Sequence, residues 1–259
     1  MDLLSTLSGF VVGVIVGATG VGGGSLMTPL LVLVMGVSPA TAVGTDLLYA
    51  SLTKVGGAWA HGRRGDVDWR VAAMLAAGSV PAAGATLIAL HLLPIGAEQY
   101  NQIITGTLSV ALILTAVALL LKDRLRAIAR RRPILRAGDG DRSRAATVAV
   151  GAVLGVLVTV SSVGAGALGV AALFFLYPGL VAVRVVGTDI AHAVPLTLLA
   201  GLGHASMGAV DWGLLGSLLL GSLPGVYLGS AVSRKLPERL LRTLLAAMLV
   251  LVGGKLIAA

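Results

Sequence analysis

The chain has 259 residues, of which 57% are apolar and only 12% are charged, with a mean hydropathy of +0.98. Soluble domains carry about 25% charged residues, so this composition excludes a soluble globular domain and indicates a protein embedded in lipid. The absence of cysteine excludes disulfides, thiolate metal sites and cysteine nucleophiles. The net charge of +8 does not indicate nucleic-acid binding, because nine of the 19 basic residues cluster between Lys122 and Arg144.

Apolar segments follow one another along the chain, and the second half repeats the series of the first half. Each is expected to be helical, because lipid offers no partners for backbone polar groups. The sequence therefore predicts an all-α polytopic membrane protein with a first membrane repeat (1–121), a basic loop (122–145) and a second membrane repeat (146–259). In chain order the segments are an interrupted stretch over 4–36, spans over 39–61, 71–92 and 98–121, a second interrupted stretch over 146–178, and spans over 182–204, 213–232 and 238–258.

The tripeptide Gly-Thr-Asp stands at 44–46 and again at 187–189, an offset of 143 residues. When residues 44–94 are aligned with residues 187–237 at this offset and without a gap, 15 of the 51 positions are identical. A composition so rich in Gly, Ala, Leu and Val gives roughly five by chance. The chain is therefore interpreted as an internal duplication.

The charges of the short loops predict how the two halves are oriented. Loop 62–70 has three arginines whereas loop 93–98 has no basic residue, and in the second half loop 205–212 has none whereas loop 233–242 has four. Basic loops remain in the cytoplasm, so the equivalent loops are expected on opposite faces and the repeats are expected to be inverted. This orientation puts loop 122–145 inside and both termini outside. Two topologies are consistent with this orientation. One has ten membrane crossings, and the other has six crossings plus two re-entrant hairpins.

The interrupted stretches break at Gly-rich segments, where a helix is expected to stop and restart. Free N–H groups and the positive end of the dipole make the restarted helix a natural anion site. Inverted halves with such breaks place a substrate site near the midplane, as in secondary transporters. The residues predicted to bind the anion here are Gly22, Gly23, Gly24 and Ser25 in the first break and Ser161, Ser162, Gly164 and Gly166 in the second.

Ionisable residues within spans are costly and need an explanation. Lys54 is predicted to supply positive potential to the anion; the alternative is that it snorkels or pairs with an aspartate of another helix. Asp46 lies about 12 Å along the helix from Lys54, too far for direct contact. Asp46 and Asp189, with Thr45 and Thr188, are predicted to brace the broken helices by accepting hydrogen bonds from their free N–H groups.

A second role for the aspartates is also open, because a desolvated carboxyl is a candidate proton carrier. His192 follows Asp189 by one helical turn and is a candidate partner in a coupled pair. His61 and His204, at span ends, are interpreted as interfacial hydrogen-bonding groups, with a role in a proton relay as the alternative. Four scattered histidines have no metal-ligand spacing, and Ser161 and Ser162 have no nearby general base, so neither an enzyme, a metal site nor a cofactor is predicted.

Several motifs are spread over essentially the full length of the chain: Gly17–Ser25, Val43–Asp46, Val186–Asp189, His204, Gly208, Val210–Trp212, Gly221, Ser222, Pro224 and Gly225. Together they resemble the TauE/SafE-type sulfite exporter family of anion permeases. The resemblance implies transport of sulfite, sulfoacetate or a related sulfur-containing or organic anion, coupled to protons, across a prokaryotic plasma membrane. One departure is the second break, which has fewer glycines than the first.

The favoured hypothesis is a secondary transporter of a small anion that works by alternating access, with protons and the lipid bilayer as its other partners. One alternative is a divalent-cation permease that uses Asp46, Asp189 and the histidines. The other is a passive channel or a structural membrane subunit.

Overall fold

A computed structural model describes residues 3–19, 24–92, 96–131, 140–233 and 238–258, and within these ranges the chain forms ten α-helices and no β-strand. The predicted all-α class is therefore confirmed. The helices are α1 (Leu3–Thr19), α2 (Gly24–Leu33), α3 (Pro39–Arg63), α4 (Trp69–Leu92), α5 (Ala97–Arg131), α6 (Gly140–Ser161), α7 (Ala167–Leu176), α8 (Ala182–Ser206), α9 (Trp212–Ser233) and α10 (Glu238–Ala258).

Both interrupted stretches consist of a long helix followed by a short one. α1 and α6 are each followed by a ten-residue helix, α2 or α7. The predicted spans agree with the other helices to within a few residues, except next to the basic loop. There α5 continues to Arg131 and α6 already begins at Gly140, so helix extends into both ends of the segment 122–145. The cytoplasmic position of that segment stays a prediction.

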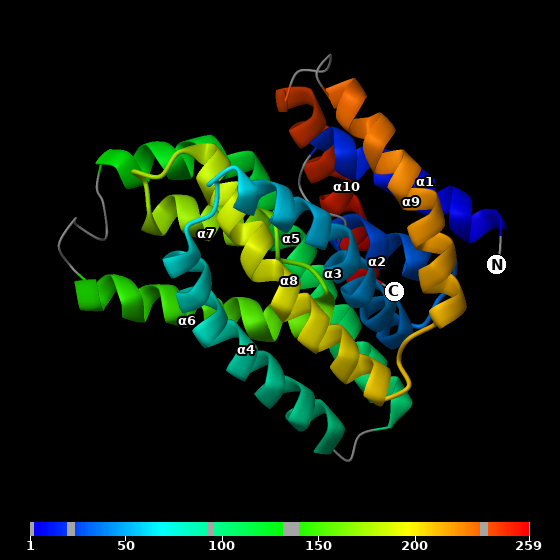
Figure 1. The fold of residues 1–259 in the computed structure, drawn as a ribbon. Helices are drawn as coiled ribbons and strands as arrows, with labels where there is room; N and C mark the ends of the chain where they lie inside the picture. The colour runs from blue at the N-terminus through cyan, green and yellow to red at the C-terminus, as the bar shows by residue number, and fades with distance from the viewer. Residues whose placement is uncertain (1–2, 20–23, 93–95, 132–139, 234–237, 259) are drawn as a thin grey trace.

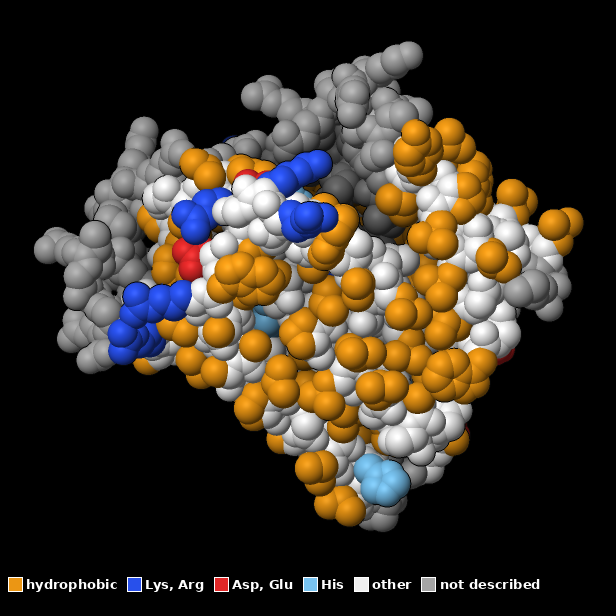
Figure 2. All heavy atoms as spheres, in the orientation of Figure 1, with side chains coloured by type: hydrophobic (Ala, Val, Ile, Leu, Met, Phe, Trp, Pro, Cys, Tyr) orange, Lys and Arg blue, Asp and Glu red, His pale blue; other side chains and the backbone are white. Residues whose placement is uncertain are grey.

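The helices present an apolar exterior. Five of the described helices are long and apolar enough to cross a bilayer, namely those containing 69–92, 97–121, 143–161, 182–206 and 212–229. Large side chains such as Leu92, Leu223 and Leu251 are more than half exposed. Hydrophobic side chains cover most of the face in Figure 2, whereas Lys and Arg gather at its upper left. A surface of this kind suits lipid, and the chain is a multi-pass membrane protein.

α3 and α8 pack against each other between two outer pairs of helices. α1 lies along α9 on one side, and α4 lies along α6 on the other (Figure 1). The first helix of each repeat thus packs on the penultimate helix of the other repeat. The two repeats are interlocked rather than side by side.

Close contacts between these outer pairs repeat in the same way. The Cα of Gly151 lies against the backbone of Leu75, and that of Gly9 lies against the backbone of Leu218, the residue equivalent to Leu75. A Cβ at either glycine would overlap the neighbouring carbonyl oxygen. Small residues that let helix backbones approach are the usual packing device of membrane helices. The contacts are reciprocal between the repeats.

Candidate functional site

Four ionisable side chains are buried where α3 and α8 meet. Asp46 is 0% exposed, Asp189 and His192 are 1% exposed, and Lys54 is 9% exposed. The packing of the two helices brings together residues that the sequence placed in separate halves. Burial of charged groups is costly unless they have partners, so the contacts of each decide what the cluster does.

Asp46 connects the short helix of one repeat to the break of the other. Its Oδ2 accepts hydrogen bonds from Thr28 Oγ1 in α2, at 2.5 Å, and from Ser162 Oγ in the second break, at 2.9 Å. Its Oδ1 has no partner in the described part of the chain. Both of these donors are side-chain hydroxyls, and the backbone of Thr28 also forms a hydrogen bond with the carboxyl. The sequence predicted backbone donors of the broken helices and did not predict the two hydroxyls. The carboxyl nevertheless contacts both short-helix regions, as a brace must.

Lys54 lies at the second break. Its Nζ donates a hydrogen bond to the carbonyl oxygen of Ala165 at 2.8 Å, and it interacts electrostatically with Asp189 and Asp46. Among the described residues, neither aspartate comes within 4.0 Å of the ammonium to form an ion pair. The alternative in which Lys54 pairs directly with an aspartate is not what the structure adopts.

Asp189 has a different environment from its equivalent, Asp46. Neither carboxyl oxygen has a hydrogen-bond partner in the ranges that the structure covers. The neighbouring residue of α7 is Gly169, and a Cβ there would overlap Oδ1. α7 therefore presents bare backbone to Asp189, whereas α2 presents the hydroxyl of Thr28 to Asp46.

His192 contacts α4 rather than Asp189. Its Nε2 lies 2.8 Å from Ser79 Oγ, and its Nδ1 has no partner in the described segments. In the first repeat the equivalent residue is Tyr49, whose side chain hydrogen-bonds Ser222, the equivalent of Ser79. The same contact is made twice across the repeats, with an imidazole in one copy and a phenol in the other. The predicted Asp189–His192 pair is close in sequence but has no hydrogen bond.

The second break is an irregular turn between α6 and α7. Ser162, Gly164 and Gly166 all have positive φ, at 59°, 125° and 136°. Gly166 is the N-cap of α7 and supplies no side-chain acceptor. The N–H of Gly169 donates to the carbonyl of Gly164 at 3.1 Å, and the N–H groups before it at the start of α7 are open to another acceptor. Ser161 Oγ donates to the carbonyl of Leu157 at 2.7 Å. Because Ser162 donates to Asp46, both serine hydroxyls predicted to bind the anion already have protein partners.

The first turn of α2 and the second break contribute to one buried cluster. Leu26 and Met27 of α2 belong to the same buried cluster as Val163, and Ala167 packs against that cluster. Of the residues predicted in the first break, Gly24 and Ser25 open α2. The predicted ligands Gly22 and Gly23 lie outside the described residues.

Thr45 and Thr188 hold helix starts of the opposite repeat. Thr45 Oγ1 accepts from the backbone N–H of Asp211 at 3.0 Å, and Thr188 Oγ1 accepts from that of Asp68 at 2.8 Å. Each aspartate in turn caps a helix, because Asp211 accepts from the N–H of Leu214 and Asp68 from that of Val71. The threonines therefore brace α9 and α4 rather than the broken helices.

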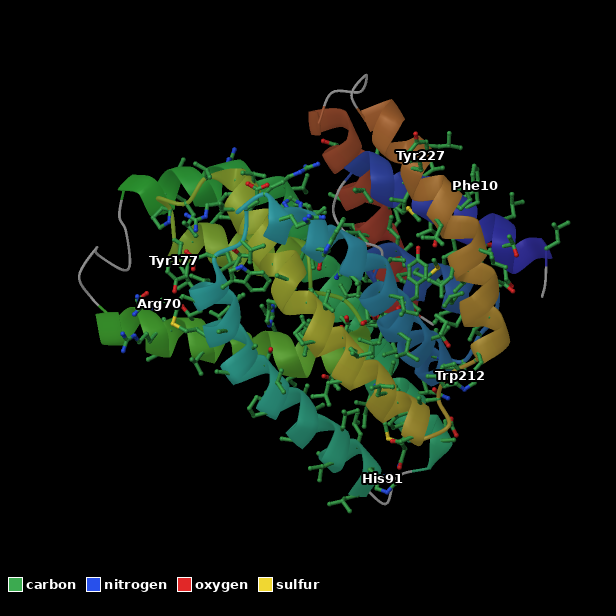
Figure 3. The ribbon with its side chains drawn as sticks, in the orientation of Figure 1. Phe10, Arg70, His91, Tyr177, Trp212 and Tyr227 are labelled. Carbon is green, nitrogen blue, oxygen red and sulfur yellow. The ribbon has the colours of Figure 1, made fainter. Side chains whose placement is uncertain are left out.

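These two helix starts lie on opposite sides of the molecule. Figure 3 shows Arg70, at the start of α4, and Trp212, at the start of α9, far apart across the bundle. Trp212 is 63% exposed and its equivalent Trp69 is 62% exposed, as suits residues at a membrane interface.

The interfacial interpretation of His204 is wrong. Its side chain is 0% exposed, and its Nε2 lies 2.9 Å from the carbonyl oxygen of Thr159 in the last turn of α6. The side chain of His204 points into the bundle, although Leu202 and Ser206 in the same turn of α8 are exposed, so a position near the end of a span does not make it interfacial. His61 is partly exposed and its Nδ1 lies 3.5 Å from Asp66 Oδ2.

Sequence reasoning did not identify Thr28, Ser79 or Gly169 as parts of the cluster. The repeated Gly-Ser pair at 78–79 and 221–222 was a signal for Ser79. Thr28 is a single hydroxyl in an apolar helix, and nothing local distinguishes Gly169 from other glycines. Their roles depend on which residue faces them across helices.

Comparison with known proteins identifies the family. A family model described as "Sulfite exporter TauE/SafE" matches residues 5–256. The chain belongs to this family. Within it, the chain is 40% identical over 258 residues to the "Probable membrane transporter protein YjnA" of Bacillus subtilis (strain 168), covering 99% of this chain and 100% of that protein.

More distant relatives carry similar names. The chain is 27% identical to the "Probable membrane transporter protein YdhB" of the same organism, over 93% of this chain and 94% of the relative. It is 29% identical to a "Probable membrane transporter protein" of Xylella fastidiosa (strain 9a5c), over 88% of this chain and 83% of that relative. No solved structure shows significant similarity to the chain. This TauE/SafE member is thus a membrane transporter, not an enzyme.

Proposed function

We propose that the protein is a secondary transporter that moves sulfite, or a related small sulfur-containing or organic anion, across a prokaryotic plasma membrane. The observation that carries this proposal is the buried ammonium of Lys54, held at the break that precedes α7. A cation and the N-terminus of a helix at one buried place favour an anion over a neutral or cationic solute. The family description names sulfite, which agrees with this chemistry.

The anion is expected to contact backbone more than hydroxyl groups. Ser161 and Ser162 already donate within the protein, while the N-cap of α7 has no side-chain acceptor. An oxyanion with three oxygens could accept from the first turn of α7 and from Lys54 at the same time. For this, Lys54 exchanges its hydrogen bond with Ala165 for one with the substrate.

The charges around the site favour coupling to protons. If Asp46 and Asp189 are both ionised and Lys54 is protonated, these three side chains together carry one net negative charge. A bound anion would add to this in a poorly solvated place, which is costly. Uptake of one proton by a carboxyl removes the excess negative charge. We therefore assign the protein to proton-coupled anion transport.

The interlocked repeats support alternating access. Equivalent contacts, such as those of Thr45 and Thr188, are made once in each direction between the repeats. In the proposed inverted topology these two contacts lie near opposite membrane faces, and rocking of one repeat against the other exposes the site to each face in turn. The exposed Arg63, Arg64 and Arg70 then lie on the cytoplasmic side, with loop 122–145, and both termini lie outside.

Reconstitution tests the proposal. Purified protein in proteoliposomes is expected to take up radiolabelled sulfite, to respond to an imposed pH gradient, and to be inhibited by unlabelled sulfonates or small carboxylates. The proposal fails if neither sulfite, sulfonates nor carboxylates move or compete. Sulfite flux that ignores the pH gradient would favour a passive channel, and metal-dependent flux of divalent cations would favour a cation permease.

A further inference from the structure

The two buried aspartates occupy equivalent positions but have unequal surroundings. The repeat places Asp46 and Asp189 143 residues apart on α3 and α8, the two helices that pack together in the middle of the bundle. In a perfectly duplicated site the two carboxyls would have the same hydrogen-bond partners. The differences between their partners therefore separate their roles.

Asp46 is held from two sides. The hydroxyls of Thr28 and Ser162 both donate to Oδ2, and these donors come from α2 and from the second break. Moving this carboxyl, or reversing its hydrogen bonds, would separate two segments of the anion site. A group with that function is poorly suited to change its state in every transport cycle.

Asp189 lacks such donors on the facing short helix. Gly169 places backbone against Oδ1, and neither oxygen accepts a hydrogen bond from the described residues. A proton can therefore bind either oxygen without breaking a hydrogen bond of the described structure. Burial of an unpartnered carboxylate is costly, which gives the proton a reason to bind.

The charged groups around Asp189 come from two helices. α3 contributes Lys54, which interacts with Asp189 electrostatically. Asp46 of α3 and His192 of α8 itself both interact with the same Lys54. α7 has no titratable side chain, and α4 has only Arg70 and His91, near its two ends. α6 carries its acidic and basic residues in its first turns, away from the break. Lys54 is therefore the group whose interaction with Asp189 a proton would weaken.

We propose that Asp189 is the carboxyl that takes up and releases the coupled proton, whereas Asp46 is a fixed brace. When Asp189 is protonated, its attraction for Lys54 falls and the ammonium becomes available to the anion. When the anion leaves, Lys54 again stabilises ionised Asp189. This assignment rests on the proposed proton-coupled anion transport and names the residue that performs the coupling.

Asp189→Asn separates coupling from transport itself. In proteoliposomes, wild-type protein is expected both to exchange internal for external radiolabelled sulfite and to accumulate sulfite when a pH gradient is imposed. Asp189→Asn should keep exchange within about threefold of wild type, lose accumulation, and exchange at a rate that no longer depends on pH. Asp46→Asn is the matched variant, and it should lose exchange and accumulation together and unfold at a lower temperature.

Each other outcome contradicts a defined claim. Accumulation by Asp189→Asn in response to the pH gradient would overturn the assignment, as would the uncoupled pattern in Asp46→Asn. Asp189→Ser, which is smaller and also carries no exchangeable carboxyl proton, is the second variant if the asparagine variant does not fold. Loss of folding or of exchange in both Asp189 variants would make Asp189 structural and would also overturn it. If wild-type protein neither exchanges nor accumulates sulfite, the proposed function itself fails.

Discussion

Lys54 illustrates how a single buried cation organises the chemistry of this transporter. It reaches from α3 to the carbonyl of Ala165 in the other repeat, and both buried aspartates lie within its electrostatic influence. Its equivalent in the second repeat is Thr197, whose hydroxyl donates to the carbonyl of Ala193 in its own helix. Of these two equivalent positions only one carries a cation, so the proposed anion site is asymmetric.

Replacement of Lys54 tests this role. Lys54→Ala removes the only positive charge of the described cluster, so uptake of radiolabelled sulfite is expected to fall at least about tenfold, with partial recovery in Lys54→Arg. The exposed Lys255→Ala is the control and should stay within about twofold of wild type. Normal uptake by correctly inserted Lys54→Ala protein would remove Lys54 from the site.

Gly169 offers a second test, because no side chain fits there without moving Asp189. The Cβ of Gly169→Ala would overlap Oδ1 of Asp189, so sulfite uptake is expected to fall by about tenfold or more. Gly216→Ala is the matched control: this helical glycine has no atom within 4 Å of an added Cβ. Alanine favours helix over glycine by about 1 kcal/mol, so a loss confined to Gly169→Ala reports the contact with Asp189. Equal uptake by the two variants would contradict the contact.

Between elements, the repeated Gly-Thr-Asp tripeptide performs two functions. Thr45 and Thr188 fasten α3 and α8 to the starts of α9 and α4, and the aspartates that follow face the broken segments. The preceding glycines allow the approach: a Cβ at Gly44 or Gly187 would overlap the backbone oxygen of Ala209 or Asp66. The tripeptide is thus a junction between helices as much as a part of the site.

The threonine contacts make a measurable contribution to stability. Thr45→Val and Thr188→Val each leave a backbone N–H without its acceptor, at a cost of about 1 kcal/mol, so each should lower the thermal unfolding temperature in detergent. The two effects are expected to add, since the contacts lie on opposite sides of the bundle. Thr53→Val, which loses only hydroxyl bonds to the carbonyls of Tyr49 and Ala50 in its own helix, should change the unfolding temperature little. An equal change in all three variants would argue against the junctions.

For the whole molecule, interlocking predicts that neither repeat is complete alone. α1 packs on α9 and α6 packs on α4, so a separated repeat would lose a large apolar contact. Two chains divided within 132–139 are expected to restore sulfite uptake to within a few fold of wild type when co-expressed, because no described helix is cut. Each chain expressed alone should be inactive and unstable in detergent. Activity of either chain alone would contradict the interlocked arrangement.

The amino-acid sequence by itself determined the class and the helix order of this protein, and it predicted an internal duplication. Hydropathy, glycine breaks and the offset of 143 residues are properties of the linear chain. Each apolar segment forms a helix in lipid whichever neighbours it packs against, because its backbone polar groups must bond within the segment. It also singled out Asp46, Lys54, Asp189 and His192, because charge inside an apolar span is visible without a fold.

Only the tertiary structure decided how those residues differ. Thr28 and Ser162 are 18 and 116 residues from Asp46 in the sequence, and Ala165 is 111 residues from Lys54. No local sequence pattern predicts partners at such separations. The burial of His204 likewise depends on α6 covering the end of α8. Equivalent residues of a duplicated chain meet non-equivalent neighbours when the repeats interlock, and the contacts across that interface distinguish one aspartate from the other.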